Sequence, residues 1–457
     1  MTIERWTTRL SWLEPFWLLS LGIPIILPGK LIPLRYQPYL LVALFLFWPL
    51  RWIAYGRLSR RTLLDWNIAL FLLWLPVNLW ASADRTTSWI AAGYFLFGLT
   101  LYMALVNWPP AQRKPQLAAW LLLLIGGGLA IASPPLTAWK PQFRLFDLPL
   151  YNRLQSLPID LGETIHANIL AGALVIVLPI FVSLAIKKKG TQINADKRRW
   201  TQVALRLLFC VMALVVGGVI MLTQSRGGYL ALAVALPLVF ILRWPRLIYS
   251  VPVLVVVAML AINRAGLGVV LDQLSSDGTL GGWAGRIDIW TQSLNALHDF
   301  VFTGIGIGTF TLVLPLLYPL RVSIEGYPHA HNLFLQIGVD LGLPGLIAYL
   351  ALLIDLFVML WGSLRAFRFT SPSDLQSSGD DSLYRALAAG AFGGLVAMLT
   401  HGLLDAVTWG NKLAFVPWVL FALITLIHQK TSKTLPLVEI DRNSSPEETS
   451  SSTARGI

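Results

Sequence analysis

Long apolar stretches follow one another along nearly the whole chain, with short polar segments between them. A membrane-spanning helix needs about 20 mostly apolar residues, because each residue advances the helix by about 1.5 Å across about 30 Å of hydrocarbon. The pattern predicts about twelve such helices, at 10–28, 38–56, 64–82, 88–107, 117–136, 165–186, 202–223, 227–243, 247–264, 333–361, 384–404 and 410–428. We therefore expect an all-α, polytopic integral membrane protein.

Two of these stretches are irregular. The first contains Glu14 and prolines, which makes it a weak span. The tenth is too long for one simple crossing. Its residues Gly342, Pro344 and Gly345 predict a break into a short segment followed by a true crossing.

The segments between the predicted spans include two long ones, 137–164 and 265–332. The second is too rich in Trp, Phe, Leu and Gly to be disordered. Within it, the stretch from Ile287 to Phe300 repeats apolar residues at helical spacing, which predicts an amphipathic helix lying against the membrane surface. The apolar face of that helix would consist of Ile287, Trp290, Leu294 and Leu297.

The end of the chain has a different composition. Residues 431–457 are rich in Ser, Thr and Glu, which predicts a disordered tail. We therefore expect one polytopic membrane domain at 1–430, followed by this tail.

Composition agrees with a membrane protein. The chain is 56% hydrophobic and 13% charged, whereas soluble domains are about 25% charged, and its mean hydropathy is +0.66. These values exclude a secreted domain, a nucleic-acid-binding module and a disordered protein. Cys210 is the single cysteine, so no disulfide framework or cysteine-based metal site is expected.

The net charge of +12 is interpreted first as a topology signal. Lys and Arg concentrate in cytoplasmic loops of membrane proteins. With the N-terminus placed in the cytoplasm, the predicted inner segments hold about twice as many Lys and Arg as the outer ones. The densest inner cluster lies between Lys187 and Arg199. This distribution predicts that both termini, including the tail, lie in the cytoplasm.

Polar residues in the apolar part of the chain are informative, because an ionisable group costs about 2.5–3.5 kcal/mol at the centre of a membrane helix. They gather mainly on the predicted outer side. The four places are Thr223–Gly228, Gly285–Trp290, His329–Asn332 and Thr400–Asp405.

Two arginines on that side are candidates for anion binding. Arg226 is followed by Gly227 and Gly228, which let a ligand approach the backbone closely. Arg286 begins the predicted amphipathic helix. A guanidinium pairs with phosphate through two hydrogen bonds and keeps its charge. The alternatives are a snorkelling arginine in a tight turn for Arg226 and an arginine facing phospholipid headgroups for Arg286.

His329 and His331, with Asn332 beside them, allow several interpretations. Two histidines spaced i, i+2 on a helix point different ways, and the chain contains neither a second cluster with metal-ligand spacing nor an Asp-x-Asp motif. We therefore expect no metal. A general base or hydrogen-bonding role fits better, and a structural histidine at the interface is the alternative. Asp340 and Asp405 would either orient such a histidine or cap helices.

The polar motifs, taken in order, resemble the O-antigen ligase and polymerase superfamily. Ser225–Gly228 is similar to its upstream arginine motif, and the resemblance covers most of 60–428, with a ligase-like region at about 205–405. The later motifs that carry it are Gly285–Trp290, Thr303–Phe310, His331–Gln336 and Asp340–Gly345.

The resemblance implies a glycosyltransferase of the GT-C type with a large periplasmic loop at 265–332, in the bacterial inner membrane. The donor would be a glycan on undecaprenyl diphosphate, and the acceptor a hydroxyl such as that of lipid A-core, in O-antigen or other surface polysaccharide biosynthesis. Transfer would be inverting, need no metal or other cofactor, and occur on the periplasmic face. No nucleic-acid partner is implied.

The resemblance also assigns roles to residues. Arg226 and Arg286 would bind the donor diphosphate, and His331 would activate the acceptor hydroxyl. The supporting residues would be Gly227, Gly228, Asn332, His329 and Asp405. Asp340 stands where the family more often has Glu, which bears only on the surroundings of the site. The roles of His166, His329 and His401 stay open.

Three alternatives remain at this point. A polymerase of the same superfamily would use a second lipid-linked glycan as acceptor, and a protein O-oligosaccharyltransferase would use a protein hydroxyl. A transporter of small solutes such as inorganic carbon would need charges near the midplane of broken helices. The predicted spans carry few charges there.

Overall fold

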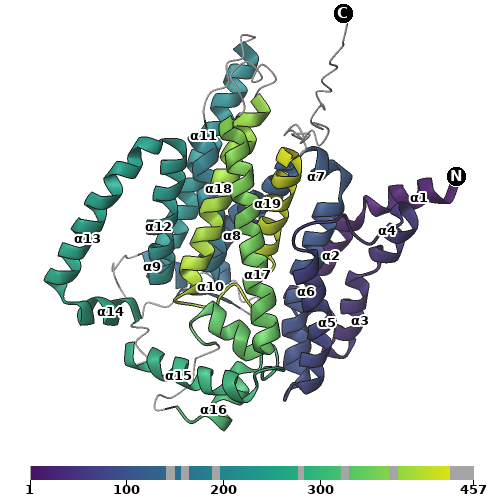
Figure 1. Cartoon of the computed structure of the whole chain (residues 1–457), viewed down its shortest axis with the longest axis horizontal. Helices are drawn as coiled ribbons and strands as arrows, with labels where there is room; N and C mark the ends of the chain where they lie inside the picture. The colour runs from purple at the N-terminus through teal and green to yellow at the C-terminus, as the bar shows by residue number, and fades with distance from the viewer. Residues whose placement is uncertain are drawn as a thin grey trace, which may run out of the picture.

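The computed structural model is almost entirely helical (Figure 1). It describes residues 2–139, 150–155, 164–187, 196–275, 283–320, 329–369 and 379–432. The predicted tail from 433 onward lies outside the described residues, as do parts of the two long connecting segments.

The N-terminal half consists of helices that precede and include the central helix α10. In chain order these are α1 (Thr2–Ser11), α2 (Glu14–Ile26), the 3₁₀ helix η1 (Leu34–Tyr36), α3 (Gln37–Leu44), α4 (Phe47–Tyr55), α5 (Asp65–Ala81), α6 (Arg85–Asn107), α7 (Pro109–Arg113), α8 (Gln116–Leu136), α9 (Leu150–Gln155) and α10 (Ala167–Ala185). Two short strands, β1 (Thr137–Ala138) and β2 (Ile165–His166), pair in parallel, with Ala138 opposite His166. They hold the start of α10 beside the end of α8.

The C-terminal half carries the candidate motifs. Its elements are α11 (Asp196–Thr223), α12 (Arg226–Arg243), the 3₁₀ helix η2 (Pro245–Ser250), α13 (Val251–Ala265), α14 (Leu267–Ser275), α15 (Trp283–Asp299), α16 (Phe310–Leu317), α17 (Leu333–Phe369), α18 (Gly379–Gly402) and α19 (Val416–Ser432). Helices α14 to α16 fall in the segment predicted as the large outer loop, and α15 and α16 lie below the bundle in Figure 1.

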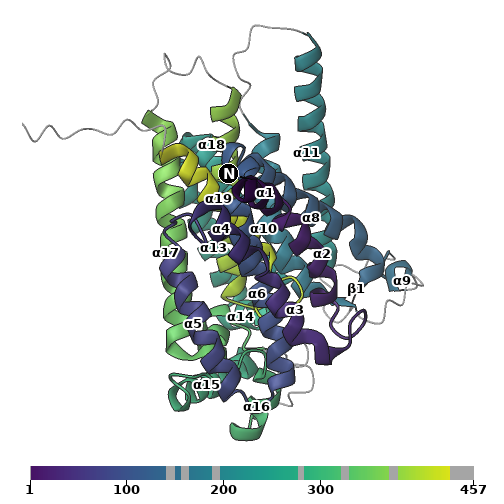
Figure 2. The ribbon, with the colours of Figure 1, turned by 90° about the vertical axis from the view of Figure 1, so that its right-hand side faces the viewer.

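Helix α10 forms the centre of the bundle and is buried along most of its length. It packs against α8, α11, α12 and α18. Small residues allow this close packing: a Cβ at Gly172 would lie 2.2 Å from Val407, and one at Gly394 would lie 2.5 Å from the carbonyl oxygen of Ile176. On the other side of the bundle, α2 and α3 pack against α6 (Figure 2). Helix α13 stands apart and has no buried residue.

Nine helices or helix pairs among the described residues are long and apolar enough to cross a membrane. The prediction of a polytopic membrane protein is thus confirmed, but the count of twelve is not. Each of the twelve predicted stretches contains helical structure, although some are helical only in part. However, α5 and α19 contain 17 residues, at the lower limit of the length of a span, and α2 contains only 13.

The predicted break in the tenth span is confirmed. Gly342 interrupts α17 with φ +71° and ψ −174°. A Cβ at this position would lie 2.3 Å from the carbonyl oxygen of Phe302. Glycine therefore allows both the left-handed conformation and the close approach of a second backbone.

The predicted amphipathic helix is present as α15, although its buried face is not the predicted one. The face turned toward the rest of the chain is formed by Gly285, Arg286, Ile289, Ser293 and Ala296. Of the predicted apolar face, Trp290 and Leu297 pack against the core, whereas Ile287 and Leu294 are exposed. Exposure of these two side chains is what contact with a membrane surface requires, and that contact remains a prediction.

Glu14, the residue that made the first predicted span weak, is neutralised by an ion pair. Arg51 Nη2 on α4 lies 3.1 Å from Glu14 Oε1, and both side chains are 2% exposed. Arg51 Nη1 also donates to the Met103 carbonyl oxygen at 3.3 Å. The pair thus joins α2, α4 and α6 in a place where an isolated charge would be costly.

Replacing Arg51 by methionine is expected to lower the free energy of unfolding by about 3–5 kcal/mol, because Glu14 would stay buried without its partner. Unfolding of the purified protein in detergent measures the effect. The double variant Glu14→Gln/Arg51→Met should recover most of the loss. Arg57→Met, at an exposed position just beyond α4, serves as control and should change stability by no more than about 0.5 kcal/mol. A single Arg51→Met variant as stable as wild type would contradict the prediction.

Candidate active site

Two histidines meet a carboxylate at the start of α17. His329 Nε2 lies 3.0 Å from Asp405 Oδ1, and His331 Nδ1 lies 3.7 Å from the same oxygen. The two imidazole rings are 4.5 Å apart between centroids. Arg286 of α15 donates to the carbonyl oxygen of Leu404, the residue before Asp405. His331, Asp405 and Arg286 are all buried, so α15, α17 and the segment after α18 form one enclosed polar cluster.

The backbone around His331 is held in an unusual conformation. His331 has φ +49°, in the left-handed region that non-glycine residues rarely adopt. Asn332 Oδ1 accepts a hydrogen bond from the Leu335 amide at 3.0 Å and so caps α17. Its Nδ2 donates to the Leu403 carbonyl oxygen at 3.3 Å. Asn332 therefore links the start of α17 to the segment that carries Asp405.

Gln336 and Asp340 hold this loop in place through a chain of hydrogen bonds. Gln336 Oε1 accepts from the Ala330 amide at 2.7 Å, and its Nε2 donates to Asp340 Oδ1 at 2.8 Å. Asp340 Oδ2 also accepts from Trp409 Nε1 at 2.9 Å. Asp405 is thus the carboxylate placed to orient a histidine, whereas Asp340 acts on the histidine loop only through Gln336.

The Thr303–Phe310 motif is held by a residue far away in the sequence. Asn78 of α5 donates to the carbonyl oxygens of Thr303 at 2.7 Å and Asp340 at 2.6 Å, and its Oδ1 accepts from the Ile307 amide at 3.0 Å. Gly304 has φ +66°, and a Cβ there would lie 2.3 Å from the Asp340 carbonyl oxygen. This motif therefore fixes the connection after α15 against α17 and does not reach the histidines in the described contacts.

The arginine motif lies at the start of α12, close to the same cluster. Ser225 Oγ accepts from the Gly228 amide at 3.2 Å and lies 3.4 Å from His401 Nε2. A Cβ at Gly227 would be 3.4 Å from the His401 ring. The Asp405 amide donates to the His401 carbonyl oxygen at 3.0 Å. His401 thus connects the arginine motif to Asp405. Arg226 is the first residue of α12, and the N-terminus of a helix favours the binding of anions.

The electrostatics of the cluster set the charge of Asp405. Burial by itself raises the pKa of this carboxyl group, but interactions with three nearby histidines and one arginine lower the pKa more strongly, to about 2. The groups that lower it are His329, His331, His401 and Arg286. Asp405 is therefore a carboxylate at neutral pH and accepts hydrogen bonds.

His331 is shifted in the direction that favours the neutral imidazole. Burial lowers its pKa well below 6.5, and His329, Arg286 and His166 lower it further, while Asp405 opposes them. At neutral pH the ring therefore keeps a lone pair on one nitrogen, which is the form that accepts a proton.

The geometry of the cluster also bears on metal binding. The ligand atoms of His329, His331 and Asp405 lie within 4.8 Å of one another. The sequence indicated Asp405 only as one of two carboxylates that could orient a histidine, because Asp405 follows a different helix. Three such ligands suit a transition metal. However, Arg286 adds a fixed positive charge at the same cluster, which works against a cation.

Sequence reasoning missed four residues or left their roles open. His401 and Ser225 join α18 to α12, His166 begins α10 close enough to influence His331, and Gln336 supports the histidine loop. His166 and His401 share one visible signal, since both lie at the predicted outer ends of spans. For Ser225 and Gln336 the signal is weaker, because their partners are far away in sequence.

The comparisons with known proteins bear on the middle of the chain. A sequence model of a protein family described as O-antigen ligase matches residues 208–350. The match contains Arg226, Arg286 and His331 and ends before His401 and Asp405. No curated protein matches the chain. Residues 208–350, within this polytopic helical protein, therefore match the family that the ordered motifs predicted.

Proposed function

We propose that the chain is a glycosyltransferase that moves a glycan from undecaprenyl diphosphate to an acceptor hydroxyl in surface polysaccharide biosynthesis. The observation that carries the proposal is the meeting of His331, Asp405 and Arg286 at one end of the helix bundle, beside the start of α12. The O-antigen ligase domain at 208–350 supports a reaction of this class.

In the proposed reaction, the acceptor oxygen attacks the anomeric carbon of the glycan from the side opposite the diphosphate. The new carbon–oxygen bond forms as the bond to the diphosphate breaks, and the departing oxygen keeps the electron pair. His331 takes the proton of the hydroxyl group. The configuration at the anomeric carbon is inverted, and no other proton acceptor is required.

Arg226 and Arg286 would stabilise the negative charge that grows on the diphosphate. Such interactions strengthen in the transition state, which is the condition for accelerating the reaction. Guanidinium groups can then supply the charge that a metal ion supplies in other transferases. We therefore propose transfer without a metal, with Asp405 and His329 orienting His331 and the Asp405 carboxylate balancing the positive charge of the arginines.

The proposed topology puts this cluster in the periplasm. It follows from the excess of Lys and Arg on the opposite side of the predicted spans. Both termini would then lie in the cytoplasm, and the membrane would be the bacterial inner membrane. A lipid-linked donor would reach the cluster from the outer leaflet. Lipid A-core is one acceptor that would be available there.

Reconstitution tests this function directly. Purified protein in proteoliposomes receives a glycan on undecaprenyl diphosphate together with lipid A-core, and mass spectrometry follows the products. We expect transfer to the acceptor and an unchanged rate in EDTA. Coupling of one lipid-linked glycan to another would identify a polymerase instead. Uptake of bicarbonate by the same vesicles, with no transfer to any acceptor, would contradict the proposal.

The rate of transfer is expected to hold its plateau as the pH falls through 6.5 and to decline only at more acidic pH. Burial lowers the pKa of His331, and His329, Arg286 and His166 lower it further, so the neutral base persists where a free imidazole is half protonated. The measurement is kcat/KM from about pH 5 to 8. Because the unfolded chain binds more protons at His331 below pH 6.5, stability falls in the same direction, and the folded fraction is measured at each pH. An acidic limb centred at or above 6.5 would argue against this role.

A further inference from the structure

A cavity lies between four helices at the end of the bundle opposite the histidines. It opens between α8, α10, α11 and α18 and encloses about 170 Å³. Its lining includes the end of α10 and the beginnings of α11 and α18. The opposite ends of the same three helices, at His166, Thr223 and His401, lie next to the candidate active site. The cavity is therefore separated from that site by the length of the bundle.

Most of the cavity wall is apolar. Trp120 and Phe209 face each other with ring centroids 5.6 Å apart, and Leu123, Leu184 and Leu205 line the space beside them. Apolar cavities of about 150 Å³ accommodate hydrocarbon groups of the size of benzene. The cavity is thus large enough for part of an alkyl chain.

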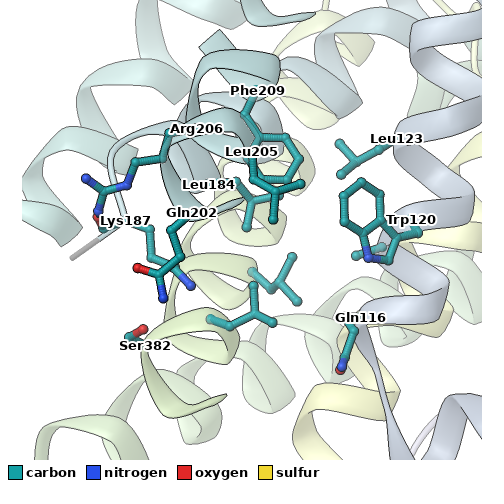
Figure 3. Close-up of a pocket in the computed structure, with 13 residues that line it drawn as sticks. Gln116, Trp120, Leu123, Leu184, Lys187, Gln202, Leu205, Arg206, Phe209 and Ser382 are labelled. Carbon is teal, nitrogen blue, oxygen red and sulfur yellow. The ribbon is translucent and has the colours of Figure 1, made fainter. Parts of the chain in front are cut away.

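One side of the cavity is basic and polar. Figure 3 shows Arg206, Lys187, Gln202 and Ser382 along one side, with Trp120 and Leu123 along the other. Arg206 donates to the carbonyl oxygen of Lys187, just beyond the end of α10, which fixes the guanidinium at the rim. An arginine has five N–H donors, so one such bond leaves donors for an anion. The described lining contains no acidic residue.

We propose that this cavity binds one anionic phospholipid, with the phosphate held by Arg206 and Lys187 and part of an acyl chain inserted between Trp120 and Leu205. The charge of the rim selects a negative headgroup, and the apolar wall selects a chain. In the topology derived from the loop charges, the headgroup belongs to the cytoplasmic leaflet, where basic pockets between helices bind anionic lipids.

A free phosphate ion would match only one of the two features of the cavity, its basic rim. It would pair with the basic rim but would leave the apolar wall without an occupant. A zwitterionic lipid would fill the wall but would bring a positive group close to Arg206 and Lys187. The two parts of the cavity together therefore point to a lipid with a net negative headgroup.

Native mass spectrometry of the purified full chain in detergent tests this proposal, with phosphatidylglycerol, phosphatidylcholine and inorganic phosphate as probes. We expect one phosphatidylglycerol per chain, bound about tenfold more tightly than phosphatidylcholine, and a higher melting temperature with phosphatidylglycerol alone. Arg206→Gln should weaken phosphatidylglycerol binding about tenfold, through the loss of charged hydrogen bonds. Lys187→Gln should weaken it in the same direction, and it keeps the backbone carbonyl that Arg206 binds.

Arg243→Gln is the matched control. Arg243 Nε donates to the Ile186 carbonyl oxygen at 2.9 Å, so it holds the same end of α10, but it does not line the cavity. This variant should bind phosphatidylglycerol like wild type. Equal binding of the two lipids, wild-type binding by both Arg206→Gln and Lys187→Gln, or equal stabilisation by inorganic phosphate would each overturn the proposal. Lipid binding is measured without glycan transfer, so its failure leaves the proposed function untouched.

Discussion

Replacing His331 by asparagine is expected to lower the rate of glycan transfer by about 10²–10⁴-fold, the range that a general base contributes. Asparagine suits this position because it tolerates the left-handed conformation that His331 adopts at φ +49°. It can form hydrogen bonds but cannot take up a proton at neutral pH. The measurement is kcat and KM for a lipid-linked donor and its acceptor, with the melting temperature recorded for each variant.

A matched control for this variant lies on α15. His298 is 89% exposed and contacts Asp299, away from the cluster. His298→Asn should transfer glycan at the wild-type rate. If His331→Asn folds and also transfers at that rate, His331 is not the base. If it loses activity together with its melting transition, the role of His331 is structural.

Much of the bundle could be predicted from local patterns. The break at Gly342 was visible because a glycine and a proline interrupt one long apolar run, and both act on their own backbone. Helix α15 was visible from its spacing of apolar residues. Its buried face was predicted less well, because hydropathy cannot distinguish a side chain that contacts lipid from one that contacts protein. Ile287 is exposed, and the charged Arg286 is buried.

The limits of the pattern are clearest at the ends of helices and between distant helices. Hydropathy predicted a weak span that contains Glu14. It could not predict the ion pair that Glu14 forms, because Arg51 belongs to another helix. It also indicated spans at α5 and α19, which are helices of 17 residues, at the lower limit of the length of a span.

The candidate site, too, could be predicted only in part from the sequence. The order of the motifs predicted that Arg226, Arg286 and His331 belong to one site. The match of residues 208–350 to the O-antigen ligase family includes all three residues. Asp405 was noted only as a possible partner of a histidine. Its contact with His329 and the contact between His401 and Ser225 depend on how α12 and α18 pack around α10. This packing cannot be deduced from the spacing of residues along the chain.

Replacing Arg286 by glutamine is expected to lower kcat by about 10²–10⁴-fold with a smaller change in KM. Each charged hydrogen bond contributes about 1.5–3 kcal/mol, and an arginine can form two with a phosphate group. The loss should fall on kcat because the diphosphate becomes more negative as the glycosidic bond breaks. Single-turnover transfer from the lipid-linked donor measures the chemical step.

Arg286 also donates to the Leu404 carbonyl oxygen and lies close to Asp405, so its structural role has to be separated from its role in transfer. Arg286→Lys keeps the positive charge beside Asp405 but loses the paired donors, and should recover stability more fully than kcat. Arg264→Gln, at an exposed arginine on the isolated helix α13, should change neither. If Arg286→Gln raised KM and left kcat unchanged, the guanidinium would bind donor and transition state equally well, and the stabilisation of the leaving diphosphate would have to come from Arg226.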